Sequence, residues 1–133
     1  MGQEPIRATT ILICDDNTAM RVMLRAVVEF MPAMSVVGEA ADGEAAISEA
    51  SRLQPDVILL DLAMPVLSGL DALPRLRQVA GAAKIIVLAG FSTATVADEV
   101  LALGADRYLE KGADIESIIT AIEHVVAGTT VRA

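Results

Sequence analysis

The chain has a single cysteine, almost no aromatic residues and no long hydrophobic run. Because Cys14 is the only cysteine of 133 residues, neither a disulfide within the chain nor a cysteine-based metal cluster can form. Aromatic residues make up 2% of the sequence while 54% is hydrophobic. The core must therefore be aliphatic, built from Val, Ile, Leu, Ala and Met, with Cys14 as a buried small hydrophobic residue.

Segments that direct a chain to a membrane are also lacking. No apolar run approaches the roughly 20 residues of a membrane span, and the first residues include no hydrophobic signal-peptide region. The opening Met-Gly does not continue as a myristoylation signal, because Ile6 stands where Ser or Thr is required. We therefore expect a soluble, cytoplasmic protein that does not bind membranes.

Positive charge is scarce. Ten Lys and Arg residues face eighteen Asp and Glu residues, which gives a formal net charge of −8 and a sequence pI near 4.5. Nucleic-acid binding requires clustered basic side chains that neutralise phosphates, whereas the basic residues of this chain are scattered along the sequence. We expect no direct binding of nucleic acid by this segment.

Five short apolar runs alternate with five amphipathic stretches. The runs, at residues 10–14, 35–39, 56–61, 84–89 and 106–110, are typical of strands buried on both faces of a parallel sheet. Helices are predicted at 18–30, from 42 to about 53, from 69 to about 79, from a cap at Ser92 or Thr93 to Gly104, and at 115–127. The last helix is predicted to stop at Gly128 and to bury an apolar stripe, which comprises Ile115, Ile118, Ile119, Ile122 and Val126.

This alternation predicts one α/β domain with a five-stranded parallel sheet, doubly wound in flavodoxin-like (βα)5 order. Residues 10–128 would form the domain, with an N-terminal extension at 1–9 and a C-terminal tail at 129–133. In such sheets, binding sites form beyond the carboxyl ends of the strands. The residues that this rule brings together are Asp15 and Asp16, Asp61, Ala89 and Gly90, and Lys111.

Three acids at neighbouring strand ends predict a metal site. Asp15, Asp16 and Asp61 would repel one another, and the pKa of at least one would rise unless a cation were bound. Ligation by oxygen atoms alone favours Mg²⁺. The structural alternative is that Asp15 and Asp16 merely cap the first helix, but a cap needs only one short polar residue. We favour the metal interpretation.

Lys111 adds a compact cation to this set. A carboxylate that attacks a phosphoryl group needs positive charge beside the phosphoryl oxygens, which Mg²⁺ and a lysine supply. A plain salt bridge between Lys111 and Asp61 is the structural alternative, and it is compatible with the first role when the phosphoryl group is absent.

Three motifs resemble those of receiver domains of two-component response regulators, over about residues 10–128. They are Asp15-Asp16-Asn17 with the following Met20, Arg21 and Leu24; Asp61-Leu62-Ala63-Met64-Pro65 with Gly69; and the run from Gly104 to Lys111. The pairs Lys111-Gly112 and Asp42-Gly43 look closer to the NarL/FixJ branch, whose members carry a C-terminal helix-turn-helix output domain of LuxR type.

The resemblance implies a signalling role rather than an enzyme. Asp61 would accept a phosphoryl group from a sensor histidine kinase, a phosphotransfer protein or a small phosphodonor. Asp15, Asp16 and Asp61 would hold Mg²⁺, or another divalent cation such as Mn²⁺, with the backbone carbonyl of Ala63 as a further ligand. Lys111 would contact the phosphoryl oxygens. An output domain outside this chain would regulate transcription if the chain is the receiver of a DNA-binding regulator; a single-domain receiver is the alternative.

The resemblance also implies two protein contacts. A homodimer would form through the face of the last two helices. The apolar residues Val22, Met23 and Ala26 of the first helix would contact the kinase.

One position departs from the family pattern. The family has Thr or Ser at the end of the fourth strand, where Ala89 stands here without a hydroxyl. Tyr108 matches the switch aromatic of the family, which turns inward on activation; a half-buried edge residue is the structural alternative. A weakened switch, or a degenerate receiver that binds partners without phosphorylation, would follow from Ala89.

Two other functions and one other site residue fit the sequence less well. Phosphatases of the haloacid dehalogenase type use Asp-x-Asp, but the second residue after Asp61 is Ala63. Flavin or nucleotide binders need a glycine-rich phosphate loop, and neither this loop nor a Walker motif is present. His124, the only histidine, is predicted to be an ordinary residue of the last helix rather than a phosphoryl carrier.

Overall fold

Residues 8–90 and 94–130 are described by the computed structural model, and within them five strands form one parallel sheet. The strands are β1 (Thr9–Cys14), β2 (Met34–Ala40), β3 (Val57–Asp61), β4 (Lys84–Ala89) and β5 (Arg107–Glu110). Their bounds differ from the predicted ones by at most one residue at either end. The order in the sheet is β2-β1-β3-β4-β5, which confirms the predicted flavodoxin-like winding.

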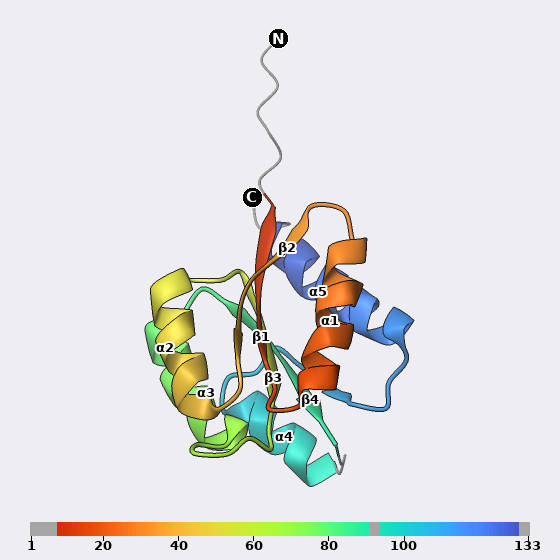
Figure 1. Ribbon diagram of the computed structural model, residues 1–133. Helices are drawn as coiled ribbons and strands as arrows, with labels where there is room; N and C mark the ends of the chain where they lie inside the picture. Colours follow the sequence, from red (N-terminus) through yellow and green to blue (C-terminus); the bar gives the residue numbers. More distant parts are fainter. Residues whose placement is uncertain (1–7, 91–93, 131–133) are drawn as a thin grey trace.

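The helices of the described ranges lie in two layers. They are α1 (Thr18–Phe30), α2 (Gly43–Leu53), α3 (Gly69–Val79), α4 (Ala94–Ala102) and α5 (Ile115–Thr130). Helices α1 and α5 cover one face of the sheet, while α2, α3 and α4 cover the other (Figure 1). Right-handed crossovers between parallel strands require helices on both faces.

The sheet is buried on both faces by these two layers. In β3, Ile58 and Leu60 pack with α2 and α3, while the alternating Val57 and Leu59 pack with α1 and α5. Among the described residues no aromatic side chain is buried, which confirms the predicted aliphatic core. Cys14 is buried within it, as predicted.

The last helix differs from its prediction in two ways. Ile115 is 52% exposed rather than part of the buried stripe, and the buried positions include Ala121 and Val125. The first buried position of α5 is Ile118, so the first turn of the helix lies outside its packed interface. The helix also continues through Gly128 to Thr130, because a glycine ends a helix only where it adopts a positive φ, and Gly128 does not.

The fourth helix ends slightly earlier than predicted. It stops at Ala102, and Gly104 follows with φ 115° while its N–H donates to the carbonyl of Leu101 at 3.2 Å. Gly104 therefore supplies the predicted left-handed stop. The predicted caps Ser92 and Thr93 lie outside the described residues.

Candidate functional site

Two buried aspartates meet at the carboxyl edge of the sheet. In the parallel register of β1 and β3, Cys14 lies opposite Leu60, so the next residues along, Asp15 and Asp61, become neighbours. Their side chains are 1% and 2% exposed, whereas Asp16 is exposed. One carboxylate oxygen of each of the three acids lies within 4.8 Å of the others. The predicted convergence of the acids is thus present.

Neither Asp15 nor Asp16 caps helix α1. The cap is Asn17, whose Oδ1 accepts from the N–H of Met20 at 2.9 Å. Asp15 instead accepts from the N–H of Asn17 through Oδ1 at 2.9 Å, which holds its carboxylate in place and leaves Oδ2 directed elsewhere. The capping alternative for the two acids is therefore wrong.

Arg21 holds the same loop from the helix side. Its Nη1 donates to the carbonyl oxygen of Asp15 at 2.7 Å, and its Nε donates to Glu39 on β2 at 3.0 Å. The sequence offered one signal for this role, since Arg21 follows the cap by four residues and returns to the same end of α1. The contact to the backbone of Asp15 could only be seen in the structure.

Lys111 bridges the two buried carboxylates. Its N–H donates to the carbonyl of Ala89 at 2.8 Å, which positions the residue after β5 beside the end of β4. Its Nζ lies 3.0 Å from Oδ2 of Asp15 and 3.1 Å from Oδ2 of Asp61. Both distances are those of close ion pairs, and among the described residues Lys111 is the one charged partner of either Oδ2 atom. One ammonium thus serves two buried anions, and the salt bridge to Asp61 is confirmed.

The site shifts the pKa of both Asp61 and Lys111. Burial raises the pKa of Asp61 above its ordinary value, and the negative charge of Asp15 adds to this; the N–H of Ala63 and the ammonium of Lys111 oppose it without cancelling it. Burial by itself lowers the pKa of Lys111, but the ion pairs with the two aspartates outweigh burial, so the net shift is upward. Lys111 alone therefore does not offset the unfavourable effect of burial on the ionised carboxylate of Asp61.

These three acids could hold a divalent metal ion. The two buried carboxylates of Asp15 and Asp61 share a single ammonium, so the site keeps a negative charge that a bound cation would neutralise. Asp16, which is exposed, supplies a third oxygen on the solvent side, where water molecules can complete the coordination shell. Hard oxygen donors combined with retained water suit Mg²⁺.

The loop after Asp61 is held close to the site. The N–H of Ala63 donates to Oδ1 of Asp61 at 3.2 Å, and the N–H of Gly69 donates to the carbonyl of Leu62 at 2.8 Å. A Cβ at position 69 would lie 2.0 Å from the carbonyl oxygen of Asp61, so only glycine fits there. Val66 is 81% exposed and has φ 69°, a strained conformation for a β-branched residue.

The two predicted switch positions lie on neighbouring strands. Ala89 ends β4 and is buried, with only a methyl group at the place where the family has a hydroxyl. Tyr108 is half-buried on β5, opposite Val87 of β4, and packs against the core layer beneath α2, α3 and α4. In the register of the two strands Ala89 lies opposite Glu110, two residues after Tyr108.

Comparison with known proteins decides the family. Residues 11–123 match the model of the response regulator receiver domain. The chain belongs to this family. It is 39% identical over 133 residues to the nitrate/nitrite response regulator protein NarL of Escherichia coli K12, a match covering 98% of this chain and 59% of that protein. The corresponding protein NarP of the same organism is 41% identical over 121 residues, covering 91% of this chain and 56% of NarP.

A solved structure agrees with this placement. The crystal structure of a two-component response regulator of the LuxR family from Aurantimonas sp. SI85-9A1 superposes with a TM-score of 0.86 at 31% identity, covering 91% of this chain and 86% of that one. The receiver domain is thus one of the NarL type, as the sequence motifs indicated. The chain spans a little over half the length of its curated relatives. Within the described ranges, no helix is both long and apolar enough to cross a bilayer.

Proposed function

We propose that this receiver domain is a phosphorylation-controlled switch in which Asp61 accepts a phosphoryl group. The donor would be a phosphohistidine of a sensor kinase or phosphotransfer protein, or a small acyl phosphate. One observation carries the proposal: the buried carboxylate of Asp61 shares the ammonium of Lys111 with Asp15 and lies beside a third acid, Asp16. A structural ion pair would not need two further carboxylates.

The chemistry requires positive charge around the transferred group. An oxygen of Asp61 would form a bond to phosphorus while the bond from phosphorus to the donor breaks, and negative charge would collect on the three equatorial oxygens. Lys111 would neutralise part of that charge from its place 3.1 Å from Asp61. A divalent cation held by Asp15, Asp16, Asp61 and the carbonyl of Ala63 would neutralise the rest. The N–H of Ala63 would hold the acceptor carboxylate in its orientation.

Phosphorylation would act on a larger protein. Since NarL and NarP extend well beyond the matched region, we propose that this domain regulates transcription through an output domain outside the given chain. Function as a cytoplasmic signalling protein, without enzymatic turnover of its own, and homodimer formation are part of the same proposal.

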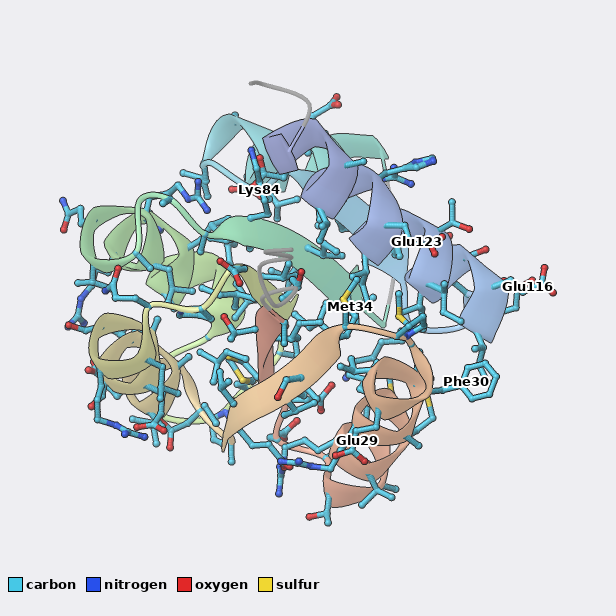
Figure 2. The ribbon with its side chains drawn as sticks, turned by 90° about the horizontal axis from the view of Figure 1, so that it is seen from above. Glu29, Phe30, Met34, Lys84, Glu116 and Glu123 are labelled. Atoms are coloured by element: carbon cyan, nitrogen blue, oxygen red, sulfur yellow. The ribbon has the colours of Figure 1, made fainter. Side chains whose placement is uncertain are left out.

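The kinase would dock on the exposed side of α1. Val22 is 64% exposed, Ala26 is exposed as well, and Met23 is half-buried, so two of the three predicted contacts are accessible. They continue into an apolar groove of about 330 Å³ between α1 and α5, where Phe30 projects outward at 82% exposure next to Ile115 (Figure 2). A kinase helix with apolar side chains fits this groove.

Docking and chemistry can be separated by experiment. Phe30→Ser should slow phosphotransfer from a cognate kinase at least about tenfold, because it removes the largest apolar contact of the groove. Phosphorylation by a small acyl phosphate should be unchanged, since Phe30 lies away from Asp61. Equal loss with both donors would assign the effect to folding and contradict docking at this groove.

The acceptor itself is tested by intact mass measurement. After incubation with Mg²⁺ and acetyl phosphate, the chain should gain one phosphoryl group, and chelator should prevent the gain. Asp61→Asn should abolish it, whereas Asp71→Asn, which changes an exposed acid in the first turn of α3, should not. A phosphoryl group that persists in Asp61→Asn would refute the assignment.

A degenerate receiver is the second candidate, favoured only by Ala89. A missing charge-assisted hydrogen bond removes roughly 1.5–3 kcal/mol of the preference for the active state, which is similar to a typical allosteric coupling energy. Ala89→Thr should therefore enlarge the shift of the Tyr108 resonances induced by beryllofluoride and Mg²⁺. An identical shift in both proteins would show that position 89 does not control the switch.

A further inference from the structure

The edge of the sheet opposite the acids holds two cations without a carboxylate partner. The described ranges contain eight Lys and Arg side chains. The six that form ion pairs with Asp or Glu are Arg21, Arg25, Arg52, Arg75, Arg77 and Lys111. The other two are Lys84 and Arg107. In a chain with a net charge of −8, it is unexpected that two of the eight described cations have no acid as partner.

Strand register brings these two cations to the same place. Arg107 begins β5 and lies opposite Ile86 of β4, and Lys84 precedes Ile86 by two residues. Since side chains alternate along a strand, Lys84, Ile86 and Arg107 share one face of the sheet. Ile86 packs with α1 and α5, so this face is the one that α5 covers. Figure 2 looks onto this amino-terminal edge and shows Lys84 beside the last part of α5.

His124 of α5 completes the group. Nη1 of Arg107 lies 3.3 Å from Nδ1 of His124. A guanidinium can only donate, so Nδ1 accepts and the ring proton resides on Nε2, which gives the imidazole a donor of its own. The three side chains line a hollow of about 430 Å³ together with Val125 and Gly128.

The one acid in this hollow is already engaged. Oδ2 of Asp106 accepts from the N–H of Ile85 at 2.9 Å and lies 3.8 Å from Nη2 of Arg77. No ion pair joins Asp106 to Lys84 or Arg107 among the described residues. The hollow thus combines two cations and an imidazole with one carboxylate, which leaves an excess of positive charge, and Val125 adds an apolar part to its lining.

We propose that Lys84, Arg107 and His124 bind a small, multiply charged oxyanion of the phosphate or phosphomonoester class. The planar guanidinium of Arg107 matches two oxygens of such a group, and the ammonium of Lys84 supplies a point charge. The site lies at the opposite edge from Asp61 and does not depend on the proposed phosphorylation. The competing structural explanation is that the two cations only face the last carbonyls of α5, where helix polarity favours positive charge.

Titration of the full chain with inorganic phosphate tests the site. The buffer contains chelator, so that no divalent cation links phosphate to the acids, and sodium chloride keeps the ionic strength constant. The ring-proton resonance of His124 should shift and saturate. Lys84→Gln should weaken the affinity at least about fivefold, since a charge-assisted contact is lost. Arg52→Gln should leave it unchanged, because Arg52 is an exposed cation of α2 that pairs with Glu49.

Calorimetry supplies the readout for Arg107→Gln, since that variant alters the surroundings of the His124 ring itself. The heat of phosphate binding seen with wild type should be lost. A shift that grows linearly without saturation, or equal affinity in wild type and Lys84→Gln, would overturn the proposal. If both variants lower the melting temperature while the phosphate affinity stays unchanged, Lys84 and Arg107 only stabilise the C-terminal end of α5, and the proposal is overturned.

Discussion

At the carboxyl edge of the sheet two buried acids share the ammonium of Lys111 beside a third acid, Asp16, whereas at the amino edge Lys84 and Arg107 form no ion pair with a described carboxylate. The edges differ in burial as well as in sign. Asp15 and Asp61 are almost fully enclosed, but Lys84 is half-buried and His124 is exposed. Uncompensated charge in water costs little, while buried charge costs several kcal/mol. The charged groups of the carboxyl edge should therefore control stability and chemistry together, while those of the amino edge should affect binding alone.

The largest expected difference in stability is between replacing Lys111 at the carboxyl edge and replacing Lys84 at the amino edge. Without divalent cations at pH 7, Lys111→Met should lower the free energy of unfolding by about 3 kcal/mol, because two buried carboxylates lose their only ammonium. Lys84→Met should change it by less than about 0.5 kcal/mol, as surface substitutions do. Urea unfolding of both variants measures the difference. Equal effects would remove the contrast between the edges.

The same glycine-to-alanine change should have opposite signs at the two edges. Gly69→Ala should lower the free energy of unfolding by about 2 kcal/mol, because its Cβ would meet the backbone of Asp61 at 2.0 Å. Gly128→Ala should raise it by about 0.5 kcal/mol, since a helical Cβ there has nothing within 4 Å and alanine favours the helix. Thermal unfolding compares them, and a stable Gly69→Ala protein would show that the acceptor loop adapts.

Asp61→Asn should stabilise the metal-free protein by about 1 kcal/mol at pH 7. Burial raises the pKa of Asp61 above its ordinary value of 3.8, so the ionised form weakens folding at neutral pH. In the wild type this penalty disappears as the pH falls through the raised pKa, and it is absent below the unfolded pKa. The stabilisation should therefore shrink between pH 7 and pH 4 in urea unfolding, while Asp71→Asn shows no such trend.

Glu39 should show the opposite pH dependence, with a smaller effect. The hydrogen bond from Arg25 lowers the pKa of Glu39 below its ordinary value of 4.5, and Arg21 adds to this. The resulting stability is present above the unfolded pKa and is lost as the pH falls through the lower, folded value. Glu39→Gln should cost about 0.5 kcal/mol at pH 7, since the pair is partly exposed. A salt-independent loss in urea unfolding would contradict an ion-pair origin.

Sequence patterns predicted the fold and the carboxyl edge well. Continuous apolar runs identified buried parallel strands, and the rule that sites form beyond strand ends selected Asp15, Asp61 and Lys111 without any coordinates. The exposed Ile115 and the helical Gly128 were misjudged. The exposure of Ile115 depends on how α5 is placed on the sheet, and the continuation of the helix through Gly128 depends on the φ of that glycine. The spacing of apolar residues along a helix predicts neither property.

The amino edge was not predictable in the same way. Lys84, Arg107 and His124 are far apart in the sequence and belong to no motif, so His124 was predicted to be an ordinary helix residue and the basic residues to be scattered. Only the parallel register of β4 and β5, with α5 laid across them, brings the three side chains together.

Calorimetric titration with Mg²⁺ asks most directly whether the acids of the carboxyl edge form a divalent-cation site. The wild-type chain should bind a single ion saturably, and its melting temperature should rise with Mg²⁺ concentration. Asp15→Asn should lose both responses, while Glu123→Gln, an exposed acid on α5, should keep them. An absent response in the wild type, or the same response in Asp15→Asn, would contradict the metal site and the proposed acceptor chemistry with it.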